Sequence, residues 1–187
     1  DVFAGVIAYN SMLNNLFARD FDIRYIQKRP MYLVHSSLDN LRPMKLTRAI
    51  VDSLLKFDND ILYKEYIGYN HYDKHLDKDL PLACEYMKGI SRNPFQSRAN
   101  WETAHSDIYS SCDWLKVTGI NKASPNAMWY APFNIIASST RQGQVIGYQY
   151  YNRLDKSAAV KAAYYNNVFS IQTSRVTEIE LLISPIM

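Results

Sequence analysis

The chain has 187 residues, 48% of them hydrophobic and 21% charged, which is the composition of a protein that buries a substantial core. Its 21 basic and 18 acidic residues are interspersed and give a net charge of +3, so nucleic acid is not an expected partner. No stretch approaches about 18 consecutive apolar residues, and we therefore expect no membrane-spanning helix.

Short apolar runs alternate with helical patterns in the first half of the chain. The apolar runs are rich in β-branched and aromatic residues, and the helical patterns place their apolar residues on one face. The expected order is strand, helix, strand, helix, strand, helix, over residues 3–9, 11–20, 31–35, 45–57, 61–66 and 80–88. Because strands that alternate with helices form parallel sheets, the predicted fold class of this half is α/β.

The helical periodicity stops near Ser91, and Asn93 and Pro94 interrupt regular structure. We therefore place a domain boundary between residues 92 and 93. Beyond it, apolar and polar residues alternate as they do in half-buried antiparallel strands. The predicted strands are 114–120, 145–151, 168–173 and 177–184. They indicate a small β-rich, sandwich-like domain over residues 93–187.

Two polar turns follow neighbouring predicted strands. Asp39 comes just after the strand at 31–35, and His71 comes just after the strand at 61–66. The carboxyl ends of parallel strands meet at one edge of a sheet, which is where such sheets bind ligands. In a catalytic triad, a carboxylate orients an imidazole, and the imidazole takes the proton of a hydroxyl nucleophile. The carboxylate and the imidazole must therefore lie side by side, as these two turns would place them. The alternatives are that Asp39 caps its own turn and that His71 is a structural loop histidine.

These turns resemble those of the α/β-hydrolases, and within them the prolyl oligopeptidase and esterase branch. Residues 35–39 with Pro43 resemble the family's His-Gly-x-x-Asp-x-x-x-Pro pattern, and residues 68–71 resemble its Gly-x-x-His loop. The resemblance covers about residues 1–90. It implies that residues 1–92 are the C-terminal portion of an α/β-hydrolase domain, with Asp39 as the triad acid and His71 as the general base. Ser36 stands where the family has glycine, so the acid turn is expected to differ.

A nucleophile for this pair is missing from the sequence. In the family the serine precedes the acid, on a Gly-x-Ser-x-Gly elbow, and the six glycines form no such motif. We therefore expect a fragment of a serine hydrolase for ester or peptide bonds, inactive alone and without a cofactor. Its expected partners are the substrate, the missing N-terminal half and, through an exposed sheet edge, a second copy. Tyr69 and Tyr72 flank His71 and are candidates for lining a substrate pocket.

Two alternatives to a hydrolase site remain open. A metal site is suggested by the spacing of His71, Asp73, His75 and Asp77, but the zinc-protease pattern requires glutamate where Tyr72 stands. We therefore predict no metal and expect His75 to be solvated. The other alternative is a non-catalytic binding or scaffold module. Either of two observations would indicate it: an acid and a base too far apart to bond, or a large exposed aromatic patch.

The location of the protein is predicted only from a resemblance. Residues 92–95 and the region beyond them resemble C-terminal extensions of some secreted bacterial hydrolases, which implies a periplasmic or extracellular site. Cys84 and Cys112 have no CxxC partner, and we expect free thiols. A disulfide between them would support an oxidising compartment.

Overall fold

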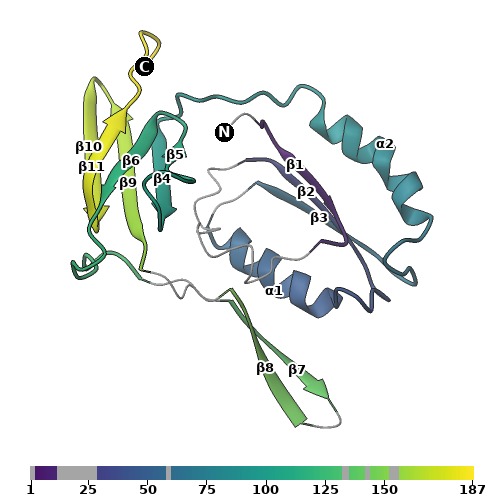
Figure 1. The fold of residues 1–187 in the computed structure, drawn as a ribbon. Coiled ribbons are helices and arrows are strands. Elements are labelled where there is room, and N and C mark those ends of the chain that lie inside the picture. Colours follow the sequence, from purple (N-terminus) through teal and green to yellow (C-terminus); the bar gives the residue numbers. More distant parts are fainter. Residues whose placement is uncertain (1–2, 12–28, 58–59, 132–134, 142–143, 152–155) are drawn as a thin grey trace.

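The computed structural model describes residues 3–11, 29–57, 60–131, 135–141, 144–151 and 156–187, with backbone alone for 135–141 and 144–151. It contains one parallel sheet with two helices, two small antiparallel sheets and a separate hairpin (Figure 1). No helix in the described ranges is both long and apolar enough to cross a membrane.

The parallel sheet has three strands in the order β1-β2-β3. These strands are β1 (Val6–Tyr9), β2 (Met31–Ser36) and β3 (Ile61–Tyr66). In the central strand β2, Ser36 pairs with Tyr66 of β3, so the two strands end side by side. The segments that follow β2 and β3 therefore leave the sheet at the same edge.

Two helices cover opposite faces of this sheet (Figure 1): α1 (Met44–Leu55) and α2 (His75–Met87). On α1, the buried apolar side chains share one face: Leu46, Ile50, Val51 and Leu54. On α2, Ala83 packs against Tyr32 and Val34 of β2. Alternate β2 side chains point the other way, where His35 meets Thr47 of α1.

A buried carboxylate attaches α2 to all three parallel strands. Asp79 of α2 accepts hydrogen bonds from the hydroxyls of Tyr9 (3.0 Å), Tyr32 (3.1 Å) and Tyr66 (2.7 Å), with Lys64 Nζ at 3.4 Å. Burial by itself would raise the pKa of Asp79, but the three hydroxyls and the ammonium group lower it overall. The hydrogen bond to Asp79, together with burial, raises the pKa of Tyr66 to about 12. The ionised carboxylate is thus the form that this cluster stabilises.

The remaining strands are antiparallel. They are β4 (Arg98–Thr103), β5 (Ser111–Cys112), β6 (Leu115–Ile120), β7 (Ile135–Arg141), β8 (Gln144–Tyr151), β9 (Ala158–Tyr165), β10 (Val168–Ser174) and β11 (Val176–Leu181). Two sheets have the orders β10-β9-β4 and β11-β6-β5, and β7 pairs with β8 in a hairpin.

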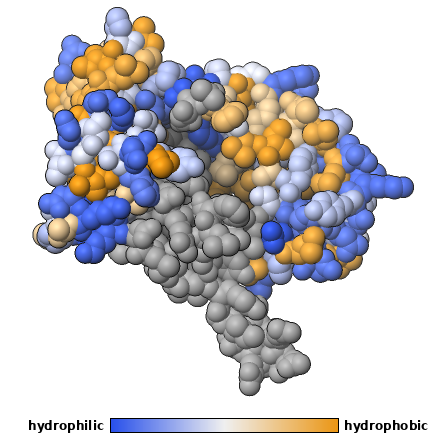
Figure 2. Space-filling view, viewed as in Figure 1, coloured by the Kyte–Doolittle hydropathy of each residue, from blue (hydrophilic) through white to orange (hydrophobic). Residues whose placement is uncertain are grey.

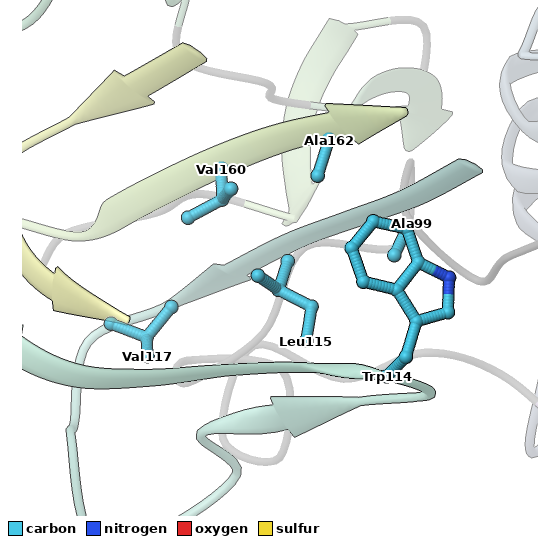
Figure 3. Close-up of a cluster of buried hydrophobic side chains, with 6 residues drawn as sticks. All are labelled: Ala99, Trp114, Leu115, Val117, Val160 and Ala162. Atoms are coloured by element: carbon cyan, nitrogen blue, oxygen red, sulfur yellow. The ribbon is translucent and has the colours of Figure 1, made fainter. Parts of the chain in front are cut away.

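The two three-stranded antiparallel sheets share one core (Figure 3). It consists of six buried apolar side chains: Ala99, Trp114, Leu115, Val117, Val160 and Ala162. Trp114 is the largest, and its indole N–H donates to the Gln96 carbonyl at 2.7 Å, so its polar group is satisfied. Figure 2 shows further apolar side chains at the surface of both the parallel and the antiparallel parts, in patches set among hydrophilic ones.

A second buried carboxylate joins the parallel and antiparallel parts. Asp113, between β5 and β6, has a fully buried side chain that accepts from Arg92 at 3.0 Å and also from Arg29. Arg29 precedes β2 and Arg92 follows α2. We call this contact the Asp113 clamp, because it holds both ends of the β2-to-α2 segment against the antiparallel part.

The predicted fold class, an α/β-hydrolase sheet followed by a β-rich domain, is wrong. The described part of the chain is mostly β, with eleven strands in four small sheets and two short helices. Alternation of strands and helices indicates the relative direction of neighbouring strands, and β1, β2 and β3 are indeed parallel. Local alternation does not determine the size of a sheet, and the antiparallel strands outnumber the parallel ones.

Several predicted elements agree with the structure and others do not. The strands predicted at 31–35 and 61–66 and the helix at 45–57 correspond to β2, β3 and α1. The helix predicted at 80–88 begins earlier, at His75. Most of the helix predicted at 11–20 lies outside the described residues, and four observed strands were not predicted: β4, β5, β7 and β9. The domain boundary after residue 92 stays a prediction.

The two cysteines differ in their environment, which predicts different reactivity. Both are free thiols: Cys84 is exposed and Cys112 is buried. Burial raises the pKa of the Cys112 thiol to about 12, and only the thiolate is reactive. Iodoacetamide at neutral pH is expected to modify Cys84 alone, and denaturant is expected to allow a second adduct. Mass spectrometry of tryptic peptides measures the modification of each site. Comparable modification of Cys84 and Cys112 in the native protein would contradict this expectation.

Candidate active site

The structure brings Asp39 and His71 into direct contact. Asp39 lies in the turn after β2 and His71 in the loop after β3, and His71 Nδ1 is 2.7 Å from Asp39 Oδ2. This is the length of a charge-assisted hydrogen bond. Because a carboxylate oxygen accepts, Nδ1 carries the proton, and in the neutral ring Nε2 is left as the basic nitrogen. Among the described residues, none is hydrogen-bonded to Nε2 of His71.

Backbone amides fix the orientation of the Asp39 carboxylate. Its Oδ1 accepts from the amides of Leu41 at 2.9 Å and Arg42 at 2.7 Å, while Oδ2 faces the imidazole. The Asp39 side chain is 0% exposed, and that of His71 is 18% exposed. The acid is therefore held by the fold, and the base reaches the surface.

A second histidine fastens the acid turn to α1. His35 Nε2 lies 2.6 Å from the Arg42 carbonyl, which can only accept, so Nε2 carries the proton. The hydroxyl of Thr47 then donates to Nδ1, at 3.2 Å. His35 Nε2 is 3.7 Å from Asp39 Oδ2, which is too long for a hydrogen bond. No role was predicted for His35 from the sequence, although its place at the start of the acid motif was a usable signal.

Backbone contacts join the acid turn and the base loop into one unit. The Ser37 amide donates to the Tyr66 carbonyl and the Leu38 amide to the Tyr69 carbonyl, both at 2.9 Å. The Gly68 amide donates to the Ser37 hydroxyl at 2.8 Å. Gly68 has φ 83°, in the left-handed region that glycine adopts without steric cost. The base loop therefore needs a glycine here to reach the acid turn.

The two predicted pocket residues lie in different environments. The Tyr72 ring meets the His71 ring edge-on, with 4.3 Å between ring centroids, and Tyr72 is 81% exposed. The Tyr69 ring packs instead against His75, at 5.1 Å, and Tyr66, at 6.0 Å. Tyr72 is thus the one that borders the base directly, and the pocket role of both stays a prediction.

The prediction that His75 is solvated is wrong, because α2 begins at this residue and turns it onto the sheet. His75 is fully buried, and its Nε2 lies 2.8 Å from the Ser36 hydroxyl. Within the part of the chain that the structure describes, no group of three or more His, Cys, Asp or Glu side chains is placed to hold a metal ion. The spacing that suggested a metal site therefore does not produce a ligand cluster.

Comparison of the chain with protein-family models, with curated proteins and with solved structures finds no match. We therefore infer the function from the residues themselves. A buried carboxylate bonded to a partly exposed imidazole, with the second ring nitrogen available, can accept a proton from a hydroxyl or from water.

Proposed function

We propose that this chain supplies the acid and the base of a serine hydrolase that cleaves ester or peptide bonds. Asp39 is the acid and His71 is the general base. The observation that supports this most directly is the 2.7 Å contact between His71 Nδ1 and Asp39 Oδ2. Separation of these two side chains was one of the two features that would indicate the scaffold alternative, and the contact removes that indication.

In the proposed reaction, a serine outside residues 1–187 attacks the carbonyl carbon of the substrate. His71 Nε2 takes the hydroxyl proton as the oxygen–carbon bond forms, and Asp39 stabilises the resulting imidazolium. His71 then gives that proton to the leaving alcohol or amine. Water repeats the same steps on the acyl-enzyme and releases the acid. Every step is a proton transfer or an acyl transfer, so the proposal includes no cofactor.

The surface around Asp39 and His71 includes apolar side chains, which supports contact with an apolar group of a substrate or partner. The exposed apolar side chains of the acid turn and base loop are Leu38, Leu41, Ile67 and Tyr72. We propose that they contact the acyl or peptide part of the substrate, or the N-terminal half of the protein. A periplasmic or extracellular location also stays a proposal, and the two free thiols give it no support.

The test uses the full protein that contains these residues and a fluorophosphonate probe, which bonds covalently to activated serines. We expect one labelled serine, outside residues 1–187, identified by mass spectrometry. His71→Gln is expected to slow labelling at least about 100-fold, because general base catalysis contributes about 10²- to 10⁴-fold. His105→Gln, a histidine of the antiparallel part, is the matched control and is expected to label at the wild-type rate.

Two outcomes would reject the proposal. One is labelling of the His71→Gln protein at the wild-type rate. The other is a folded wild-type protein in which no serine reacts, which would favour the scaffold alternative.

A further inference from the structure

Asn10, at the end of β1, lies in a strained and buried position beside the base loop. It is 3% exposed, and its φ of 47° is in the left-handed region, which asparagine tolerates better than most residues. Its own amide donates to the Val34 carbonyl at 2.8 Å and so continues the pairing with β2. The backbone thereby points the Asn10 side chain toward the ends of β2 and β3.

The partners of the Asn10 side chain determine which way its amide faces. The oxygen Oδ1 accepts from the Ser36 amide at 2.8 Å and from the Ser36 hydroxyl at 2.9 Å. A backbone amide can only donate, so this side of the Asn10 group must be the oxygen. The nitrogen Nδ2 therefore faces the His71 carbonyl, to which it donates at 2.5 Å.

The Ser36 hydroxyl extends this chain of hydrogen bonds to α2. Its single proton goes to Asn10 Oδ1, so toward His75 it can only accept, and His75 Nε2 must carry the proton of that 2.8 Å contact. Burial lowers the pKa of His75, which supports the neutral ring. His75, Ser36 and Asn10 thus form one chain of hydrogen bonds that ends at the His71 carbonyl.

We propose that Asn10 is a positioning residue for the general base and acts through its Nδ2 bond to the His71 carbonyl. This inference rests on the proposed function. His71 is held at two points: Asp39 holds the ring, and Asn10 holds the backbone on which the ring is mounted. Without the second contact, the backbone of His71 loses its bond to Asn10, although the amides of Ser37 and Leu38 still hold residues 66–69 against the acid turn. The backbone amide of Ser36 fixes the orientation of the Asn10 amide group, so that Nδ2 faces the His71 carbonyl.

The test compares Asn10→Asp with Ser36→Ala. Aspartate at position 10 keeps acceptor oxygens for Ser36 but replaces the donor that faces the His71 carbonyl with an oxygen. Ser36→Ala removes two hydrogen bonds of the same network and leaves the Asn10–His71 bond in place, so it controls for lost stability. Asn166→Asp changes another left-handed asparagine, in the exposed β9–β10 turn, and controls for the substitution itself.

The first readout is the downfield proton resonance of His71 Nδ1–H in the 187-residue chain, assigned by its loss in Asp39→Asn. We expect it to disappear in Asn10→Asp and to persist in Ser36→Ala and Asn166→Asp. The second readout is probe labelling of the full protein. Displacing a catalytic group by about 1 Å costs about 100-fold, and we expect Asn10→Asp to label about 10- to 100-fold more slowly than the wild-type protein.

Equal behaviour of Asn10→Asp and Ser36→Ala in both readouts would overturn the positioning role and leave only a contribution to stability. The two proposals can fail separately. If the full protein has no reactive serine but Asn10→Asp still abolishes the resonance, the hydrolase proposal fails and Asn10 still positions His71. If labelling occurs and Asn10→Asp changes neither readout, Asn10 has no positioning role and the hydrolase proposal stands.

Discussion

Asparagine in place of Asp39 is expected to slow serine labelling and hydrolysis by the full protein by about 10⁴-fold, the loss measured for such a change in a known triad. The structure gives the reason. The amides of Leu41 and Arg42 require an acceptor at the Oδ1 position, so the oxygen of the substituted side chain stays there and its NH₂ group faces His71. A donor at that point forces Nδ1 to accept and moves the imidazole proton to Nε2, where the base is needed.

The measurement is the rate of fluorophosphonate labelling, with thermal unfolding as a check that Asp39→Asn remains folded. Asp107→Asn, in an exposed turn before β5, is the matched control and is expected to label normally. A labelling rate within about tenfold of the wild-type rate would show that the tautomer of His71 is not controlled by Asp39.

The largest effect on stability is expected from Asp79→Ala. The side chain is fully buried and is the shared acceptor for three tyrosine hydroxyls and for Lys64. Removing one partner of a buried charged contact costs about 3–5 kcal/mol, a large part of the about 5–15 kcal/mol that stabilises a domain. Urea unfolding followed by circular dichroism measures the loss. Glu85→Gln, on the exposed side of α2, is expected to change the free energy of unfolding by less than about 0.5 kcal/mol.

The Asp79 carboxylate is also expected to make the stability of the protein depend on pH, which is tested with Asp79→Asn. The pKa of Asp79 is lower in the folded than in the unfolded protein, so its contribution is complete above the unfolded value of 3.8 and is lost as the pH falls through the folded value. The stability difference between wild type and Asp79→Asn should therefore be greatest near neutral pH and shrink below about pH 4. A difference that stays constant between pH 7 and pH 3 would show that the charge does not contribute.

The sequence predicts the neighbourhood of the site better than the fold around it. β2, β3 and Gly68 have strong local signals, and two parallel strands with one helix between them place Asp39 and His71 at one edge. Asn10 has no such signal, because its contacts depend on where β1 ends beside β2. The role of Asn10 could be found only once the strands were placed.

Two errors have identifiable physical causes. β9 reads AAVKAAYY, and alanine favours helices, but these small side chains fit a strand packed between two neighbours in the shared core. The start of α2 was predicted too late: the helix begins at His75 although Pro81, which is disfavoured in a helix interior, then lies inside it. The late start placed His75 in a solvated loop and hid its contact with Ser36.

The Asp113 clamp has a consequence for cooperativity. If the antiparallel sheets unfolded alone, Arg29 and Arg92 would lose their shared counter-charge, and if the parallel sheet unfolded alone, Asp113 would lose both of its guanidinium partners. Either partial state loses this pairing of a buried carboxylate with two guanidinium groups, which raises its free energy relative to the native state. Partially unfolded forms are therefore disfavoured, and we expect the two parts to unfold together although their buried clusters are separate.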